Sequence, residues 1–205
     1  MDLLTIVIVA VPAVLAVTVH EVAHGWVANR LGDPTAAQLG RLTLNPFKHV
    51  DPVGTLLVPI GLKLMGSPFL FGWAKPVPVD WRNLRQLPRD IALVAAAGPA
   101  SNLLMLMAWT ALIAGTAPRS LPWEMGWTGV YFNATIMALN LIPIPPLDGS
   151  RIVSAMLPPR VARAYNRYER LGLVLMLLLV VSGVLGTVLS PVLKGIERLV
   201  LQLVT

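Results

Sequence analysis

The chain has 205 residues, of which 56% are hydrophobic and only 13% are charged. A soluble domain usually has about half apolar and about a quarter charged residues, so the composition and the mean hydropathy of +0.71 exclude an ordinary soluble fold. The net charge of +6 does not indicate nucleic-acid binding, because the basic residues lie in short loops between apolar segments. The sequence contains no cysteine, so a metal site would use nitrogen and oxygen ligands.

Long apolar segments predict membrane-spanning helices, each of which needs about 20 residues. The first segment, residues 3–28, has no basic n-region and no small-residue cleavage site after its apolar part, so we expect a retained span and not a signal peptide. Residues 52–72 are apolar but contain Pro52, Pro59 and Pro68, which predicts an irregular span. The other expected spans are 91–117, 125–147 and 171–193.

Three further segments are expected to have other structures. Residues 36–48 alternate in a strand-like way and predict a short hairpin. In FGWAKPVPV, residues 71–79, two prolines exclude a helix and predict an extended stretch. The tail 191–205 is either an interfacial amphipathic helix or the end of a bent last span. We expect one all-α polytopic membrane domain over residues 1–205, with about five to six transmembrane helices and a short re-entrant or extended segment.

The distribution of basic residues predicts the orientation in the cell membrane. Lysine and arginine are enriched in cytoplasmic loops. They follow the first span, precede residues 91–117 and lie between the last two spans, whereas residues 118–124 carry only Arg119 and Glu124. The first span is therefore expected to run inward, which places the polar motifs described next in the cytoplasmic half of the bilayer.

The first of these motifs lies in VTVHEVAHGWV, residues 17–27, at the end of the first span. On a helix, His20 and His24 share a face, and two imidazoles at this spacing can hold one zinc ion. Glu21 stands beside the first ligand and can take a proton from a water on that metal. The alternative is a chance match in a solvated cluster. Ionisable groups inside a membrane are costly, and this cost favours the metal site.

A catalytic zinc ion usually has three protein ligands, and two residues are candidates for the third position. Asp148 in NLIPIPPLDGSR lies at the cytoplasmic end of an inward span, at a depth similar to that of the two histidines. Its alternative role is to cap a short helix over residues 150–157. The other candidate is His49, although a loop histidine among basic and turn residues is more often solvated. The matching depth favours Asp148.

Two asparagines lie at the level of the predicted metal site. Asn102 ends the segment AAAGPASN, in which small residues allow helices to approach closely, and Asn140 begins the segment that leads to Asp148. Each has two roles that the sequence leaves open. It either forms a hydrogen bond that supports the substrate or its oxyanion, or it packs helices together through its amide.

Three segments carry a family resemblance: HEVAHG at 20–25, GPASN at 98–102 and NLIPIPPLDG at 140–149. Together they resemble the site-2 protease family of intramembrane zinc metalloproteases. GRLTLNPFKHVDPVGT and FGWAKPVPV are similar to segments of its small prokaryotic members, the type without PDZ or CBS modules. The resemblance covers most of the chain.

The resemblance implies one Zn²⁺ ion bound by His20, His24 and Asp148, with Glu21 as the catalytic base. It also implies regulated intramembrane proteolysis, in which a peptide bond is hydrolysed within a transmembrane segment of a single-span membrane protein. The expected partners are this substrate and the lipid bilayer, with no nucleic acid. A helical substrate must unwind before attack, and we expect an extended edge from residues 36–48 or from WAKPVPV to hold it by strand addition.

A zinc transporter is the alternative from another functional class. Such a protein would use Glu21 as a ligand or gate, and it would need further ligands along a path. The chain instead offers one cluster and a single outlying histidine, His49. A purely structural scaffold leaves the ionisable groups of the first span unexplained. The sequence therefore favours the protease.

Overall fold

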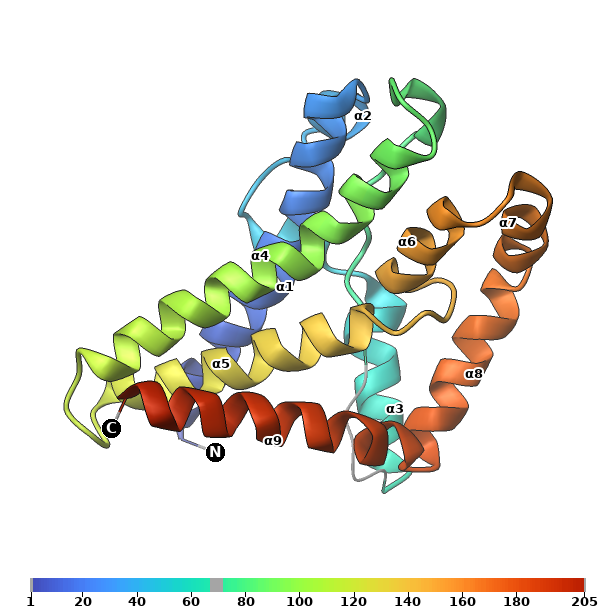
Figure 1. Ribbon diagram of the computed structural model, residues 1–205. Coiled ribbons are helices and arrows are strands. Elements are labelled where there is room, and N and C mark those ends of the chain that lie inside the picture. The colour runs from blue at the N-terminus through green and yellow to red at the C-terminus, as the bar shows by residue number, and fades with distance from the viewer. Residues whose placement is uncertain (1, 67–71, 205) are drawn as a thin grey trace.

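The computed structural model describes residues 2–66 and 72–204, and all regular structure in these residues is helical (Figure 1). Short 3₁₀ or π turns, labelled η, separate some of the α-helices. In chain order the elements are α1 (Leu3–Leu31), α2 (Thr35–Gln38), η1 (Pro46–His49), η2 (Pro52–Leu57), α3 (Val58–Leu64), η3 (Trp81–Asn83), α4 (Arg89–Ala114), α5 (Leu121–Asn140), α6 (Asp148–Met156), α7 (Pro159–Asn166), α8 (Glu169–Val181) and α9 (Val184–Val204).

Two of these helices, α1 and α4, are long and apolar enough to cross a membrane. The bent pair of α8 and α9 adds a third candidate if it is counted as one span. α1 begins where the Asp2 carboxylate accepts a hydrogen bond from the Thr5 N–H (2.8 Å), and it ends before Gly32, which has a left-handed φ of 117°. The prediction of an all-α membrane fold is confirmed at this level, whereas the count of five to six spans stays a prediction.

The centre of the molecule is formed by α1, α4 and α5, and α9 lies along α5 (Figure 1). α4 and α5 approach closely because α5 presents glycine: a Cβ atom at Gly129 would lie 2.4 Å from the Trp109 ring. The apolar core between α4, α5 and α9 consists of Leu106, Ile113, Val130, Ala134 and Val200. These contacts give the site a rigid helical frame.

The last predicted span, residues 171–193, is not one continuous helix. α8 ends at Val181, and α9 continues from Val184 at an angle of 78°. Gly183 between them has a left-handed φ of 75°, which an uninterrupted α-helix does not allow. The prediction of a continuous span is therefore wrong. The tail 191–205 is the second part of α9, which runs to Val204, and whether it lies at the interface or ends a bent span stays a prediction.

The predicted hairpin over residues 36–48 is also wrong. This part of the chain forms α2 and the 3₁₀ turn η1, and no strand occurs in the described residues. The Asn45 side chain accepts a hydrogen bond from the Phe47 N–H (3.1 Å), and Pro46 occupies the first position of the turn. Gly40, with a φ of 62°, reverses the chain after α2. Local turn chemistry thus overrides the alternating pattern.

Two other predicted spans are shorter than expected. The irregular one begins with η2 and α3, which together run from Pro52 to Leu64, too short to cross a bilayer. Its predicted end at residues 67–71 lies outside the described residues. α5 stops at Asn140, because the prolines that follow provide no N–H groups and force a series of turns up to α6.

Residues 73–80 contain neither helix nor strand, as the two prolines predicted. Three backbone N–H groups of this extended stretch point to one side. The Trp73 N–H donates to the Gly54 carbonyl (3.1 Å), the Lys75 N–H to the His49 carbonyl (2.8 Å) and the Val77 N–H to a side chain on α1. The stretch therefore passes directly beside the HExxH motif.

Candidate metal centre

Three side chains from distant parts of the sequence meet in one cluster, His20 and His24 on α1 and Asp148 at the start of α6. The two histidine Nε2 atoms lie 3.1 Å apart. Asp148 Oδ2 lies 3.2 Å from Nε2 of His20 and 3.3 Å from Nε2 of His24. The part of the chain that the structure describes contains no second group of this kind. The structure thus brings together the three residues that the sequence singled out.

The far side of each imidazole is held by a hydrogen bond to α4. Nδ1 of His20 lies 2.6 Å from Asn102 Oδ1, and Nδ1 of His24 lies 2.7 Å from the Val94 carbonyl oxygen. Both partners are acceptors, so each Nδ1 carries the proton and each Nε2 keeps a lone pair. The two lone pairs face Asp148, as in metal sites whose histidines are oriented by outer hydrogen bonds.

The cluster fits a tetrahedral zinc ion. With metal–ligand distances of about 2.0–2.1 Å, neighbouring tetrahedral ligand atoms lie about 3.3–3.4 Å apart. The three observed separations of 3.1, 3.2 and 3.3 Å match one face of such a tetrahedron. The buried Asp148 Oδ2 atom also has no hydrogen-bond partner among the described residues, which suits an oxygen that binds a metal.

The amide of Asn102 is itself fixed by two further bonds. Its Nδ2 donates to the Ala16 carbonyl on α1 (3.1 Å) and to Asn133 Oδ1 on α5 (2.9 Å). Asn133 in turn donates to the Gly129 carbonyl (2.8 Å). Asn102 and Asn133 are both completely buried. This network connects all three central helices to His20. Nothing in the sequence indicated that Asn133 takes part in it.

Gly98 allows α4 to pack against the imidazoles. A Cβ atom at this position would lie 2.4 Å from His24 Nε2 and 2.5 Å from His20 Cε1. The segment AAAGPASN predicted a close approach of helices. The structure shows that at Gly98 the partner is the pair of histidine rings.

Asp148 reaches the cluster because the proline-rich turn delivers it there. The turn places Gly149 against α5, where a Cβ atom would lie 2.3 Å from the Leu141 carbonyl oxygen. On the outer side, the Tyr165 hydroxyl donates to the Pro143 carbonyl (2.5 Å). Asp148 is the first residue of α6, but the N-cap is Leu147 and no side chain caps the helix, so the alternative role of Asp148 as a cap is wrong.

Glu21 follows His20 on α1 and lines the same cavity as the cluster. Its Oε2 accepts a hydrogen bond from the Val77 N–H (2.8 Å). Pro76 and Pro78 keep that stretch extended, so its backbone stays in reach of α1. The bond orients the Glu21 carboxylate, and it ties the extended stretch to the motif that it crosses.

The cavity has a volume of about 680 Å³ and is lined by α1, α4, α5, α6, α8 and the extended stretch. At its rim, Arg151 forms an ion pair with Glu169 (2.8 Å) and lies 5.8 Å from the centre of the Trp81 ring. Asn140 lines the cavity, and its Nδ2 donates to the Ile136 carbonyl of its own helix (3.0 Å). Asn102 instead lies behind His20. Roles in substrate or oxyanion binding remain predictions for both asparagines.

His49 is not part of the cluster. The sequence suggested a solvated loop histidine, and this is wrong, because only 3% of its surface is exposed. Nε2 of His49 lies 2.9 Å from the Thr43 carbonyl oxygen, and the His49 carbonyl accepts the Lys75 N–H. The residue therefore supports the loop under the extended stretch.

Asp33, just beyond the end of α1, anchors the turn that carries Trp81. Its carboxylate accepts hydrogen bonds from Asn83 Nδ2 (2.9 Å), the Asp80 N–H (2.8 Å) and the Thr35 N–H (3.1 Å). Burial alone would raise the pKa of Asp33, but these bonds outweigh it and hold the pKa below its ordinary value. The ionised form of Asp33 thus holds the rim of the cavity in place.

Comparison with known proteins agrees with this site. The profile of Peptidase family M50 matches residues 116–183. "Putative zinc metalloprotease YwhC" from Bacillus subtilis is 35% identical over 199 residues, covering 93% of this chain and 87% of that protein. "Putative zinc metalloprotease Rip2" from Mycolicibacterium smegmatis is 29% identical over 180 residues, covering 84% and 66%. Rip2 from Mycobacterium tuberculosis is 32% identical over 179 residues, covering 84% and 66%. No solved structure matches the chain.

The sequence resemblance, the cluster and the relatives lead to one assignment. The family is membrane-embedded, in agreement with the apolar helices. The ligand set agrees with the zinc named in the relatives. The chain belongs to peptidase family M50, the site-2 protease family, and is a zinc metalloprotease.

Proposed function

We propose that the chain hydrolyses a peptide bond within or near a transmembrane segment of a single-span membrane protein. In this proposal His20, His24 and Asp148 bind one zinc ion, and Glu21 is the general base. The observation that carries it is the meeting of three ligand atoms within 3.3 Å of one another, in a cavity that also holds Glu21. The cavity lies against both helices of membrane-spanning length.

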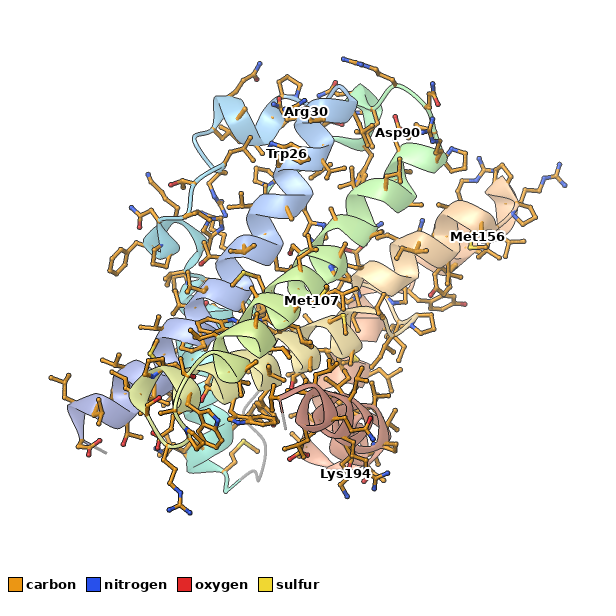
Figure 2. The ribbon with its side chains drawn as sticks, turned by 60° about the vertical axis from the view of Figure 1, so that its left-hand side comes forward. Trp26, Arg30, Asp90, Met107, Met156 and Lys194 are labelled. Atoms are coloured by element: carbon orange, nitrogen blue, oxygen red, sulfur yellow. The ribbon has the colours of Figure 1, made fainter. Side chains whose placement is uncertain are left out.

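The end of the molecule near the site is proposed to face the cytoplasm. Arg30 in the last turn of α1 and Asp90 in the first turn of α4 lie at the same end, whereas Lys194 lies toward the opposite one (Figure 2). Basic residues such as Arg30 at this end mark the cytoplasmic side. His24 precedes the end of α1 by seven residues, or about 10 Å at 1.5 Å per residue. This depth corresponds to the cytoplasmic half of the bilayer.

The proposed topology counts one membrane-embedded domain over residues 1–205. We propose six membrane-embedded helices, α1, α3, α4, α5, α8 and α9. Of these, α3 is too short to cross the bilayer alone, and α8 and α9 form one bent candidate span. The extended stretch lies between α3 and α4 in the chain and is irregular backbone. Such backbone is tolerated at membrane depth when it is covered by protein or lines a wet cavity, and this stretch lines the cavity of the metal cluster.

The residues of the chain have separable tasks in hydrolysis. When bound, zinc supplies Lewis-acid chemistry, which polarises a carbonyl and acidifies a water. Glu21, oriented by the Val77 N–H, accepts a proton at its carboxylate and can return it to the leaving amine. Asn102 and the Val94 carbonyl keep the imidazoles in the tautomer that leaves Nε2 free. Asn140 faces the space in which an unwound substrate would lie.

The extended stretch would bind a substrate strand through only part of its backbone. The N–H groups of Trp73, Lys75 and Val77 are already used within the protein, and Pro76 and Pro78 have none. The carbonyls of Trp73, Lys75 and Pro76 also accept hydrogen bonds, from Thr55 and Arg41. A substrate strand would therefore use the remaining groups, such as the carbonyls of Val77 and Pro78. Residues 36–48 form no strand, so the proposal keeps only the WAKPVPV edge.

The zinc transporter is not favoured. A transport path needs a succession of metal ligands, and the described residues contain one cluster of side chains that could bind a metal ion. The single other histidine, His49, is bonded to the Thr43 carbonyl. Glu21 is held by a backbone N–H and is not among the three clustered ligands.

The test compares cells that express the wild-type chain or Glu21→Gln by quantitative membrane proteomics, together with the zinc content of the purified proteins. We expect Glu21→Gln to retain zinc and to lose activity by about 10²–10⁴-fold, because a positioned base contributes on that order. A single-span protein should then accumulate intact. Glu124→Gln, the same change at the start of α5, is the matched control. Unchanged cleavage would refute the assigned base, and a change in cellular zinc without substrate accumulation would favour transport.

A further inference from the structure

A row of arginines on α7 has no partner in the described structure. Arg160, Arg163 and Arg167 follow one another at i, i+3 and i+7, so they share one face of α7 and the turn after it. All three are exposed, and none of their side chains takes part in a hydrogen bond or ion pair with the described residues. By contrast, Arg82 and Arg151 are paired with Asp80 and Glu169. The arginine face of α7 is therefore three positive charges without internal compensation.

Exposed apolar side chains flank this arginine face. The exposed fraction is 80% for Met156, 49% for Val161 and 58% for Tyr168. Met156 projects from the far end of α6 (Figure 2). α7 itself has no buried residue. A short helix with arginines on one side and apolar or aromatic groups on the other is typical of the boundary between headgroups and acyl chains.

α7 lies at the end of the molecule that is suited to this boundary. In Figure 1 it is on the same side as the end of α1, α2 and the start of α4, that is, at the ends of the two helices of membrane length. When α1 and α4 cross a bilayer, these ends reach its headgroup region. Negative groups there complement the arginine face.

We propose that the arginine face of α7 is a binding site for the phosphates of anionic phospholipid headgroups. The side chain of Val161 and the ring of Tyr168 would enter the boundary beside them. Each basic residue near an anionic surface strengthens binding about fivefold, so three on one face give α7 a marked preference for anionic over zwitterionic lipid. The lipid would hold a helix that few other contacts hold.

Two hydrogen bonds connect α7 to the segment that carries Asp148. The Tyr165 hydroxyl donates to the Pro143 carbonyl in the turn before Asp148, and Asn166 Nδ2 donates to Ser154 Oγ on α6 (2.8 Å). A lipid that immobilises α7 therefore stabilises both flanks of Asp148. Binding of lipid to α7 does not depend on whether the chain cleaves a substrate. Only the effect on Asp148 rests on the proposed metal site.

The test uses the full chain in vesicles of phosphatidylcholine, or of phosphatidylcholine and phosphatidylglycerol in equal parts. The sequence has no cysteine, so Ala164→Cys on α7 provides a single site for an environment-sensitive fluorophore. We expect a blue shift of its emission with phosphatidylglycerol that disappears in high salt. Deuterium uptake of residues 143–150 should fall in the same vesicles.

The decisive variant combines Arg160→Gln, Arg163→Gln and Arg167→Gln, which should abolish the lipid-dependent shift. Its matched control removes three arginines at the same end of the molecule but outside α7, namely Arg30, Arg85 and Arg89, and should retain it. A wild-type protein without the shift, or a triple α7 variant that keeps it, would overturn the proposal. A third outcome would also overturn it: an emission shift that a polyglutamate peptide produces in pure phosphatidylcholine and that phosphatidylglycerol does not produce. An acidic protein would then be the partner.

Discussion

The part of α5 beside His20 and its interface with α9 differ in how their buried polar groups are satisfied. The contrast is confined to the part beside His20, since Trp109 Nε1 of α4, packed against Gly129, also has no hydrogen-bond partner among the described residues. At the interface with α4, Asn133 accepts a hydrogen bond from Asn102 and donates to the Gly129 carbonyl. At the interface with α9, Thr135 Oγ1 and Trp127 Nε1 are buried without a hydrogen-bond partner among the described residues. Both of these side chains line a cavity of about 850 Å³ between α5 and α9.

This difference shows where the molecule needs fixed positions. The α4 interface ends at the His20 ring, and a satisfied network of amides holds that ring in one tautomer and one orientation. The α9 interface relies on apolar contacts such as those of Val130 and Val200, which tolerate small shifts. A polar group that orients a ligand should therefore be far more sensitive to replacement than one that does not, and the next predictions test this.

The largest effect is expected for Gly98→Ala, which inserts a methyl group between α4 and the two imidazoles. Its Cβ would lie within 2.6 Å of ring atoms of both histidines, so at least one ring must move. We expect zinc affinity to fall roughly 100-fold or more, because loss of a single outer partner of a ligand already costs about 10–100-fold. Competition with a chelator measures it. Gly115→Ala, where the nearest atom is 3.5 Å away, is the control. Equal zinc affinity in the two variants would contradict the close packing.

The next effect is that of Asn102→Leu, which keeps the branching of the side chain at Cγ and removes the amide. His20 Nδ1 then loses its acceptor, and Asn133 loses a donor. We expect zinc affinity to fall about 10–100-fold and the free energy of unfolding to fall by about 1–3 kcal/mol. Asn140→Leu should leave zinc affinity unchanged, because its amide bonds within its own helix. If both variants retained zinc equally, the network would have no orienting role.

Asp33 extends the comparison outside the membrane, to a buried carboxylate whose bonds are also complete. Its pKa is lower in the folded protein than in the unfolded chain, so its stabilisation is fully present above the unfolded value of about 3.9 and is lost as the pH falls through the lower, folded pKa. The protection factors of residues 80–83 against hydrogen exchange, which correct for the intrinsic pH dependence of exchange, should therefore fall only below about pH 4. In Asp33→Asn the protection factors should be lower at neutral pH and should not fall further in acid. Protection in the wild type that does not change below about pH 4 would contradict this role.

The smallest effect is expected for Thr135→Val at the α9 interface. The substitution removes a buried hydroxyl that has no partner and keeps the shape of the side chain. The free energy of unfolding should change by no more than about 0.5 kcal/mol, or should rise slightly. Zinc affinity should not change. A loss above about 1 kcal/mol in thermal or chemical unfolding would show that the hydroxyl is bonded and that the two interfaces are alike.

The chemistry of the site was predictable because its main motif is local. The spacing of His20 and His24 places both on one helix face, whatever the helix packs against. Asp148 was predictable because prolines end its span at the depth of the histidines. Two predictions of secondary structure failed because a single residue or a local turn determines the backbone conformation. Gly183 bends the last span, and the turn at Asn45 replaces the predicted hairpin.

By itself, the sequence determined an all-helical membrane fold, the three clustered residues and the extended proline stretch. These follow from composition, helical periodicity and the absence of a proline N–H, all of which act within one segment. Only the tertiary structure decided that Asn102 orients His20, that Gly98 makes room for the rings and that the Val77 N–H holds Glu21. Each of these contacts joins residues more than 50 positions apart, and which partners meet depends on how whole helices pack and not on any local pattern.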